Sequence, residues 1–476
     1  MERASGVLMH ISSLFGDYST GTFGKQAKYF IDFLHDCGFK YWQVLPFGMV
    51  DECNSPYKSY SAFGGNPYFI DPEILSLKGL ITEEELAASR QKTPYTCEFE
   101  RLSTERMDLL LSASKRVKNR QEVEDFADSH PYLKQCAEFM ALKHANGNKL
   151  WTEWTNEEPN GDVLFMWKFI EYEFFSQWQE ILEYAHSKHV KIIGDIPIYV
   201  AYDSSDVWGN RDMFLLDKDY KPKEVAGVPP DYFCEDGQLW GNPLYDWDKM
   251  KTDGFSWWRA RLETMFSLFD GVRIDHFRGL ESYWSVPATA KTAKEGKWIK
   301  GPGRAFCDMA NSIKGDSFVI AEDLGEITDE VTKLVEYSGF PGMRVFQFGF
   351  LSDCDSPHQP HNYPKNCIAY TGTHDNNTLL GYVWELDNAA RKGMLEYCGY
   401  ESENWDACYD SIIRTMFASH ADTVIFPIQD LLKYGSDTRL NIPGKAEGNW
   451  SYRITKEQLD SIDKKHYKKL NYLYRR

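Results

Sequence analysis

Residues 270–278 read Asp-Gly-Val-Arg-Ile-Asp-His-Phe-Arg. The run Gly271–Ile274 is short and contains β-branched residues, and charged and aromatic residues follow it at once. A short run of this kind, bounded by polar residues or glycine, is typical of a buried strand in a parallel sheet. The stretch therefore predicts a strand that ends in an acidic loop, with Asp275 and His276 directly after it.

The same pattern recurs along the chain, between long segments with helical periodicity such as Lys25–Cys37 and Ser256–Phe269. The other candidate strands are Val7–Ile11, Tyr41–Leu45, Val190–Ile193, Phe318–Ala321, Met343–Phe348, Cys367–Tyr370 and Val424–Ile428. Strands that alternate with crossover helices in this number are typical of the (β/α)8 barrel. We therefore predict an α/β fold in which residues 1–476 form one catalytic (β/α)8 TIM barrel domain.

Two gaps between the candidate strands are far longer than an ordinary crossover, so they must hold insertions. The first, residues 72–161, is rich in Glu, Lys, Ala and Leu and predicts a helical subdomain. The second, residues 202–250, is dense in Pro, Gly, Asp and Trp and predicts a loop-rich subdomain. Loops at the C-terminal rim of a barrel carry function, so we expect the second insertion to contact the substrate.

Composition narrows the classes of partner. The 476 residues contain 53 Lys and Arg against 71 Asp and Glu, a net charge of −18 that would repel a phosphate backbone, and no basic patch is evident. Nucleic acid is therefore not an expected partner. Aromatic residues make up 15% of the chain, and aromatic rings stack well on the apolar faces of sugars. Aromatic residues also fill cores and interfaces, so this composition makes carbohydrate one candidate ligand class.

The sequence also indicates a compartment. It contains no run of about 18 apolar residues that could span a membrane, and its first residues lack the long apolar core of a signal peptide. The ten cysteines are scattered without a Cys-x-x-Cys pair, so we expect reduced and mostly buried thiols. These features predict a cytoplasmic protein without membrane association; they do not indicate an oligomeric state.

Carboxylates follow several of the predicted strands, where the chemistry of a barrel of this type is located. Asp195, Asp275, Glu322 and Asp375 all lie at such positions, and we expect the last three to face one another across the rim. A single aspartate there is often only a helix N-cap. A cap does not require the arginine and histidines that flank Asp275 and Asp375, so together these residues favour a catalytic site.

The residue types suggest the chemistry of a retaining glycosidase, in which two carboxyl groups lie about 5–5.5 Å apart. Arg273 lies two residues before Asp275 on the same face of the strand and could keep that carboxylate ionised, which favours Asp275 as the nucleophile. Glu322 borders an apolar run that would raise its pKa, as an acid/base requires, and Asp323 is its rival.

Other reaction classes fit less well. His276 and His374 could bind a metal together with Asp275 and Asp375, but no His-Glu-x-x-His zinc signature is present, and hydrogen bonds to sugar hydroxyls explain the histidines better. The chain also lacks the Gly-x-Ser-x-Gly motif of serine hydrolases and a phosphate-binding P-loop.

With these residues in view, nearly the whole chain resembles the 4-α-glucanotransferases called amylomaltase or disproportionating enzyme, glycoside hydrolase family 77. The matching segments are Ser5–His10, Trp42–Pro46, Ser55–Tyr57, Gly65–Tyr68, Gly194–Val200, Gly227–Asp231, Gln238–Pro243, Arg273–Arg278, Ala321–Gly325, Thr373–Asn376 and Gly448–Trp450. The chain departs from the common pattern at Ile11 and Phe15, where the family has proline. That departure concerns a rim loop and not the carboxylates.

The resemblance implies that Asp275 is the nucleophile, Glu322 the general acid/base and Asp375 the stabiliser of the transition state. It further implies a set of substrate-binding residues: Tyr57, Asp195, Trp240, Arg273 and His374 at the donor sugar, Gln238 on the acceptor side, and Asn449 near the next donor sugars. The implied reaction cleaves an α-1,4 bond of a maltooligosaccharide or larger glucan and transfers the segment to the 4-hydroxyl of another glucan or of glucose. Neither a cofactor, a metal ion nor a C-terminal β-sandwich is implied.

Two alternatives remain open on the sequence. An α-amylase-like hydrolase would use the same barrel and the same carboxylates, with water in place of the acceptor sugar; the segment Gln238–Asn242 favours transfer. A catalytically silent glucan-binding protein would keep aromatic platforms but lose a carboxylate, whereas Asp275, Glu322 and Asp375 are all present.

Overall fold

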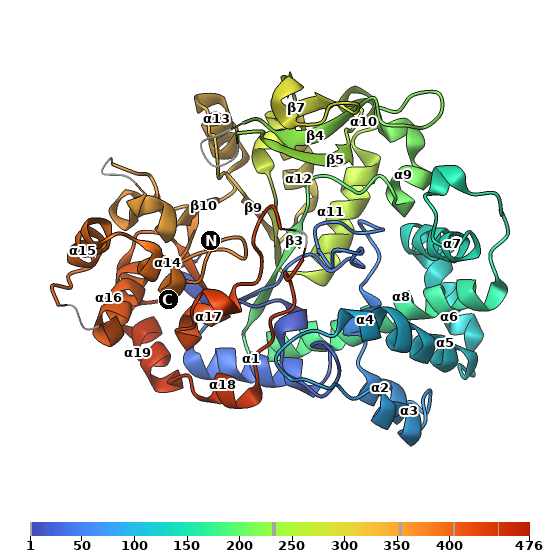
Figure 1. Cartoon of the computed structure of the whole chain (residues 1–476), viewed down its shortest axis with the longest axis horizontal. Coiled ribbons are helices and arrows are strands. Elements are labelled where there is room, and N and C mark those ends of the chain that lie inside the picture. Colours follow the sequence, from blue (N-terminus) through green and yellow to red (C-terminus); the bar gives the residue numbers. More distant parts are fainter. Residues whose placement is uncertain (1, 231–234, 352–354, 403–404, 446) are drawn as a thin grey trace.

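The computed structural model describes residues 2–230, 235–351, 355–402, 405–445 and 447–476. Its centre is a closed barrel of parallel strands in the order β1-β12-β11-β10-β9-β6-β3-β2 (Figure 1). These strands are β1 (Ala4–Leu8), β2 (Tyr41–Gln43), β3 (Lys191–Ile196), β6 (Gly271–Ile274), β9 (Phe318–Ala321), β10 (Gly342–Val345), β11 (Cys367–Tyr370) and β12 (Thr423–Pro427). The predicted (β/α)8 barrel is confirmed.

The helices that surround and extend the barrel alternate with these strands. They are α1 (Lys25–Cys37), α2 (Pro72–Leu77), α3 (Glu83–Ala88), α4 (Phe99–Arg101), α5 (Met107–Lys115), α6 (Arg120–Ser129), α7 (Pro131–Ala145), α8 (Gly161–Ser187), α9 (Ser205–Gly209), α10 (Trp247–Thr252), α11 (Ser256–Leu268), α12 (Arg304–Ile313), α13 (Asp329–Ser338), α14 (Leu379–Glu385), α15 (Asn388–Tyr397), α16 (Trp405–Ala418), α17 (Ile428–Leu432), α18 (Lys456–Asp460) and α19 (Lys464–Tyr474). In the described residues after β12, these last helices are joined by loops, and no β-sandwich is present.

The strand β3 extends further than predicted. Its run continues through Gly194 and Asp195 to Ile196, so Asp195 lies within a barrel strand and not in the loop after it. A Cβ at position 194 would lie 2.3 Å from the ring of Phe269, which explains the glycine inside the strand. Asp195 is consequently the register partner of Arg273 on the neighbouring strand β6.

The helical segment predicted for residues 72–161 contains α2 to α7, which lie with α8 on one side of the barrel (Figure 1). Local signals start these helices: Thr82 and Glu85 form a reciprocal capping box at α3, and Pro131 occupies the first turn of α7. The long helix α8 then returns the chain to β3 and packs against α5, α6 and α7.

Residues 202–250, predicted as a loop-rich subdomain, also contain strands that were not predicted. They contain β4 (Glu224–Val228) and β5 (Gln238–Pro243), which join β7 (Ser282–Pro287) and β8 (Lys297–Lys300) in a four-stranded antiparallel sheet of order β5-β4-β7-β8. The sheet lies above the barrel in Figure 1. Because β7 and β8 follow β6, the strands that complete this sheet come from outside the insertion, and the local composition of the insertion gives no sign of them.

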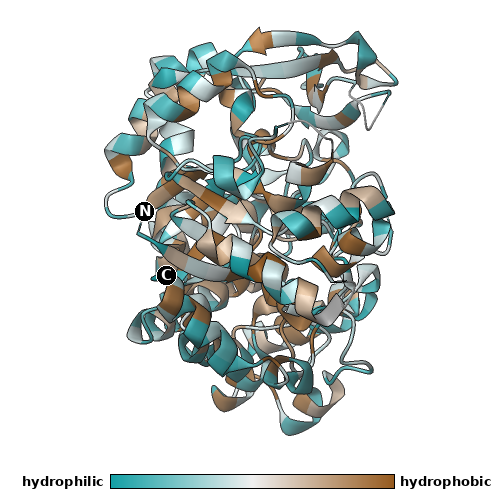
Figure 2. Cartoon of the chain, turned by 90° about the vertical axis from the view of Figure 1, so that its left-hand side faces the viewer, coloured by the Kyte–Doolittle hydropathy of each residue, from teal (hydrophilic) through white to brown (hydrophobic). Residues whose placement is uncertain are grey.

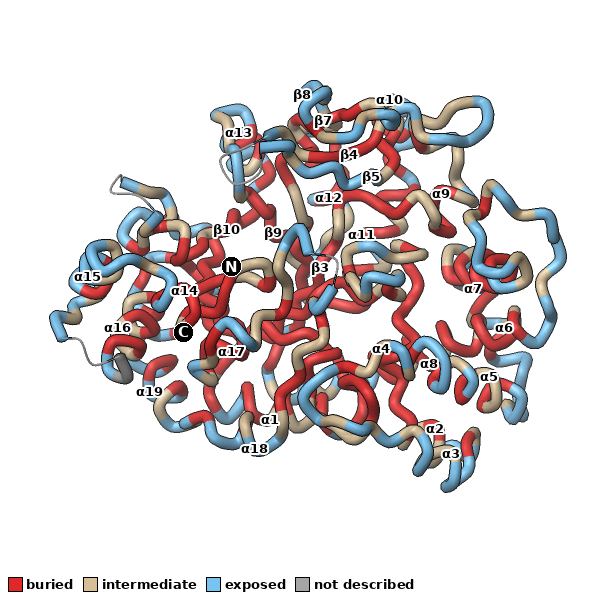
Figure 3. The backbone as a smooth tube through the Cα atoms, viewed as in Figure 1, coloured by how far each residue is buried: buried red, intermediate tan, exposed pale blue. Residues whose placement is uncertain are grey.

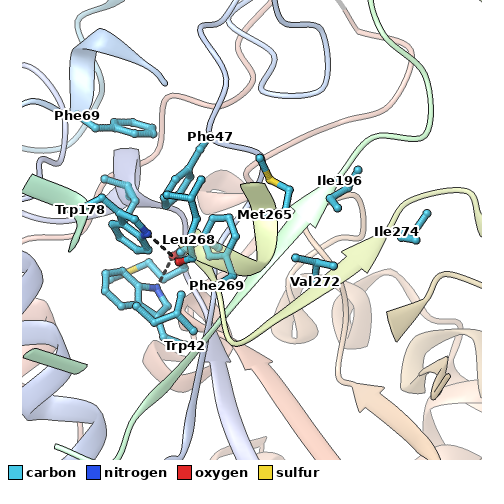
Figure 4. Close-up of a cluster of buried hydrophobic side chains, with 14 of the residues drawn as sticks. Trp42, Phe47, Phe69, Trp178, Ile196, Met265, Leu268, Phe269, Val272 and Ile274 are labelled. Carbon is cyan, nitrogen blue, oxygen red and sulfur yellow. Dashed lines mark hydrogen bonds between the residues drawn. The ribbon is translucent and has the colours of Figure 1, made fainter. Parts of the chain in front are cut away.

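Burial follows the expected layers. Figure 3 shows the barrel interior buried and the outer turns of the surrounding helices exposed, and Figure 2 shows hydrophilic residues on the outer faces of those helices. Beneath one side of the barrel, the indoles of Trp42 and Trp178 donate hydrogen bonds to the carbonyl oxygens of Met9 and Leu268, both at 2.8 Å (Figure 4). These two hydrogen bonds satisfy the buried indole nitrogens, which would otherwise destabilise the core.

Two further sequence expectations can be compared with the structure. Eight of the ten cysteines are described; none of these eight forms a disulfide, and six of them are buried, while Cys234 and Cys354 lie outside the described residues. Within the described part of the chain, no helix has both the length and the apolar character needed to cross a membrane.

Candidate active site

A cavity of about 350 Å³ opens at the C-terminal end of the barrel. It is bordered by residues from the β6 and β11 ends, from β5 and from the loops that contain Tyr57 and Trp450. Of the ten predicted site residues, six line this cavity: Tyr57, Gln238, Trp240, Asp275, His374 and Asp375. The structure thus brings together residues that are more than 300 positions apart in the sequence.

Asp275 directly follows β6, and its side chain is 31% exposed. The Nη2 atom of Arg273 donates to Asp275 Oδ1 at 2.5 Å, and the Nη1 atom of the same guanidinium donates to Asp195 Oδ2 at 2.6 Å. Burial alone would lower the pKa of Arg273, but the two carboxylates raise that pKa well above its ordinary value. The guanidinium is therefore a fixed positive charge beside the oxygen of Asp275.

Glu322 follows β9 and is buried. Two backbone amides hold its carboxyl group: His276 N–H donates to Oε2 at 2.6 Å, and Leu324 N–H donates to Oε1 at 3.0 Å. Burial, followed by the negative charge of Asp275, raises the pKa of Glu322 to about 8. A carboxyl group with this pKa is protonated at neutral pH and can donate a proton.

Asp323, the rival for the acid/base role, points toward the next barrel strand. Its Oδ1 accepts from Met343 N–H at 2.6 Å and its Oδ2 accepts from Arg344 Nη1 at 3.0 Å. These contacts fix the carboxylate of Asp323 against β10 and pair it with the cation of Arg344, whereas the carboxyl group of Glu322 accepts from two backbone amides. Neither of the two carboxyl groups lines the cavity. The geometry therefore favours Glu322 over Asp323.

Asp375 lies in the loop after β11, with its side chain 46% exposed. His374 Nε2 lies 3.2 Å from Asp375 Oδ2, and Asn441 Nδ2 donates to Oδ1 at 2.6 Å. Burial would raise the pKa of Asp375, but these two contacts bring that pKa well below its usual value. Arg439 also donates to the main-chain oxygen of Asp375, at 2.5 Å. An anion at this position can stabilise positive charge that develops on a sugar ring.

Arg439 and Asn441 were not identified from the sequence. They lie about 65 positions after Asp375, and neither belongs to a motif that we recognised. The only signal that could have found them is their position shortly after the last barrel strand, where the chain returns to the rim.

Tyr57 forms one wall of the cavity. Its hydroxyl donates to Asp195 Oδ2 at 2.6 Å, and its ring stacks on His374 with centroids 5.0 Å apart and an interplanar angle of 17°. The side chain of Asp195 is fully buried behind Tyr57 and Arg273, so Asp195 does not line the cavity. Asp195 thus contacts Tyr57 and Arg273 from behind the cavity wall, whereas we had expected it to line the donor site.

Gln238 and Trp240 lie on the edge strand β5, although we had predicted a rim loop. Gln238 pairs with Val228 of β4, which fixes the strand in the small antiparallel sheet. The indole Nε1 of Trp240 donates to Gln238 Oε1 at 3.1 Å, and the Trp240 ring packs edge-on against His276 at 4.9 Å. With 36% of its surface exposed, Trp240 presents an aromatic surface to the cavity.

Asn449 does not line the cavity, although we had expected a contact with donor sugars. Its Oδ1 accepts from Ile442 N–H at 2.9 Å, and its Nδ2 donates to the carbonyl oxygen of Lys445 at 2.9 Å. The side chain thus closes its own loop, of which Pro443 and Gly444 do line the cavity.

The histidines fit the alternative metal site poorly. The ring of His276 packs edge-on against Trp240. His374 is stacked on Tyr57 and contacts Asp375. In the described ranges no group of three or more His, Cys, Asp or Glu side chains is arranged to hold a metal ion.

Comparison with known proteins adds an independent finding. Residues 9–459 match the profile of a family described as 4-alpha-glucanotransferase. The chain is 42% identical to a 4-alpha-glucanotransferase of Streptococcus pneumoniae over 100% of this chain and 98% of the relative, and 44% identical to one of Clostridium butyricum over 94% and 95%. Its structure is similar to an amylomaltase from Streptococcus agalactiae in complex with acarbose, with a TM-score of 0.95, 38% identity and full coverage of both chains.

Proposed function

The chain belongs to the 4-alpha-glucanotransferases of glycoside hydrolase family 77, and from this premise we propose the roles of its individual site residues. The enzyme transfers a segment of an α-1,4-glucan from a donor to an acceptor. The observation that carries our assignment is the set of three carboxyl groups with different environments: Asp275 beside a fixed cation, Glu322 buried with a raised pKa, and Asp375 with a lowered pKa.

In the first half of the proposed reaction, Asp275 attacks the anomeric carbon of the donor sugar. The bond from that carbon to the glycosidic oxygen breaks as Glu322 gives its proton to the departing oxygen. The products are a shortened glucan with a free 4-hydroxyl and a glycosyl group bound covalently to Asp275. Arg273 Nη2 donates to Asp275 Oδ1 and so orients the attacking carboxylate.

In the second half, the 4-hydroxyl of an acceptor attacks the same carbon. Glu322, now ionised, takes the proton of that hydroxyl, and the bond to Asp275 breaks. The two substitutions retain the α configuration, and the number of α-1,4 bonds is unchanged. Asp375 remains anionic throughout and stabilises the positive charge that develops on the ring in both steps.

The other site residues divide into substrate contacts and supports. We propose that Tyr57, Trp240 and His374 contact the donor sugar and that Gln238 hydrogen-bonds the acceptor, which is another maltooligosaccharide or glucose. Arg273 acts on Asp275, while Asp195 and Asn449 act through the residues that they hold. This division is supported by which side chains border the cavity.

Incubation with maltotriose tests transfer against the rival hydrolase. A transferase produces glucose and a ladder of longer maltooligosaccharides while the total number of reducing ends stays constant. A hydrolase produces maltose and glucose with a steady rise in reducing ends. A rise in reducing ends equal to the maltotriose consumed, without longer products, would contradict transfer and the acceptor contact assigned to Gln238.

A further inference from the structure

His276 has a backbone conformation that is unusual for a residue with a side chain. Its φ angle is +51°, in the left-handed region, and it lies between Asp275 and the 3-10 turn Phe277–Leu280. A residue with a Cβ atom enters this region at a cost, so the surrounding contacts must hold it there. His276 is also the residue whose amide contacts Glu322.

The left-handed conformation turns the chain so that successive amides face the β9 end. His276 N–H donates to Glu322 Oε2 at 2.6 Å, and the next amide, Phe277 N–H, donates to the main-chain oxygen of Glu322 at 3.1 Å. In return, Glu322 N–H donates to Ile274 O at 3.2 Å. These bonds fix both the backbone and the carboxyl group of Glu322 relative to Asp275.

The imidazole ring of His276 is held by packing. The Trp240 ring lies edge-on to it at 4.9 Å, and a Cβ atom at Gly279 would lie 3.2 Å from its Cδ2 atom. Its Nε2 atom is buried and has no hydrogen-bond partner among the residues that the structure describes. The ring therefore fills a tight space between the turn and the β5 strand, and the proposed reaction gives it no proton to transfer.

We propose that His276 is a positioning residue for the acid/base. The left-handed backbone at His276 aims the amide at Glu322 Oε2, and the ring packs between Trp240 and Gly279 without acting on Glu322 itself. Leu324 N–H holds the other oxygen of Glu322, Oε1. The two amides together fix the carboxyl group in the orientation from which it delivers its proton. The inference rests on the proposed acid/base role of Glu322.

The test compares His276→Val with His276→Asn. Valine is strongly disfavoured in the left-handed region, whereas asparagine tolerates it. Each variant is assayed on two donor substrates. Cleavage of maltotriose needs the acid to protonate the leaving sugar, whereas the fluoride ion leaves α-maltosyl fluoride with little acid assistance. For His276→Val we expect the ratio of the two rates, maltotriose over fluoride, to fall about tenfold or more. For His276→Asn we expect the ratio to stay within about threefold of wild type. These limits correspond to about 1.4 and 0.7 kcal/mol.

A matched control is His189→Val. His189 also has a positive φ, of 57°, but it is exposed and lies just before β3, at the opposite end of the barrel. This substitution should leave the rate ratio unchanged, even if it lowers stability. If His276→Val does not fold, His276→Ala replaces it, because alanine lacks both the ring and the tolerance of asparagine for this conformation.

The double variant His276→Val/Glu322→Gln separates positioning from general damage. If His276 acts through Glu322, the valine should lower the rate ratio no further once Glu322 is gone. A ratio unchanged in His276→Val while Glu322→Gln lowers it would overturn this inference alone. A ratio unchanged in Glu322→Gln itself would overturn the proposed acid/base. Equal loss in His276→Asn and His276→Val would show that the ring, and not the backbone conformation, is what matters, and would also contradict the inference.

Discussion

Replacing Asp195 by Asn should destabilise the protein more than it weakens substrate binding. Asp195 is fully buried, the Arg273 side chain is 6% exposed, and the bond between them is 2.6 Å long. Removing one partner of a buried ion pair usually costs about 3–5 kcal/mol of unfolding free energy. We expect about 3 kcal/mol, the lower end, because the amide oxygen of asparagine can still accept hydrogen bonds and Asp275 still contacts Arg273.

The assay is urea unfolding of the wild type, Asp195→Asn, Arg273→Met and the double variant. In the double variant no unpaired guanidinium remains, so the loss should be smaller than the sum of the two single losses by more than about 1 kcal/mol. The accompanying kinetics should show a lower kcat, because Tyr57 and Arg273 are less firmly held, with a KM for maltotriose within about threefold of wild type, a limit of about 0.7 kcal/mol in apparent binding. A stability loss below about 1 kcal/mol together with a tenfold higher KM would refute this reasoning and assign Asp195 to direct substrate binding.

Three further predictions concern other residues. Glu322→Gln should slow turnover of maltotriose far more than that of α-maltosyl fluoride, and equal losses on both substrates would contradict its role. Wild-type kcat on maltotriose should fall as pH rises through about 8, where Glu322 loses its proton. A kcat that stays unchanged up to pH about 10 would also contradict this role. Gln238→Ala should lower the ratio of longer maltooligosaccharides formed to new reducing ends by up to about tenfold, because one acceptor hydrogen bond contributes about 0.5–1.5 kcal/mol; an unchanged ratio would mean that β5 does not select the acceptor. Buried Glu171, which accepts from Gly65 N–H at 2.9 Å, has a pKa raised to about 8 by burial, so the folded state holds a proton that the unfolded chain releases above its ordinary pKa of 4.5. Unfolding free energy should therefore fall as pH rises from about 4.5 to 8, and Glu171 should contribute at most about 1.4 kcal/mol per pH unit to that fall. Glu171→Gln should remove this contribution. Parallel pH profiles of unfolding free energy for wild type and Glu171→Gln would show that Glu171 does not titrate in this window.

The sequence predicted the elements whose signals are local. Three strands were predicted with the bounds that the structure has: Gly271–Ile274, Phe318–Ala321 and Cys367–Tyr370. Each is a short run with polar or charged residues directly on both sides. Their carboxylates could be located for the same reason, since the end of a barrel strand fixes where the next residue lies.

The sequence could not predict features that depend on distant partners. The strands β4 and β5 are stabilised by β7 and β8, and Asn441 reaches Asp375 only because the chain after β12 returns to the rim. Asp195 could be assigned to the site region, but its burial behind Tyr57 follows from the register of β3 against β6, which periodicity does not fix.

The most direct test of the account is to trap the covalent intermediate. In Glu322→Gln, α-maltosyl fluoride should still glycosylate the enzyme, because fluoride leaves without the acid, but transfer to an acceptor should be slow without the base. Mass spectrometry of the denatured protein should then show one added maltosyl group, and peptide mapping should locate it on Asp275. A label on Asp375, Asp323 or any other residue, or turnover of the fluoride with inversion and no labelled protein, would contradict the account.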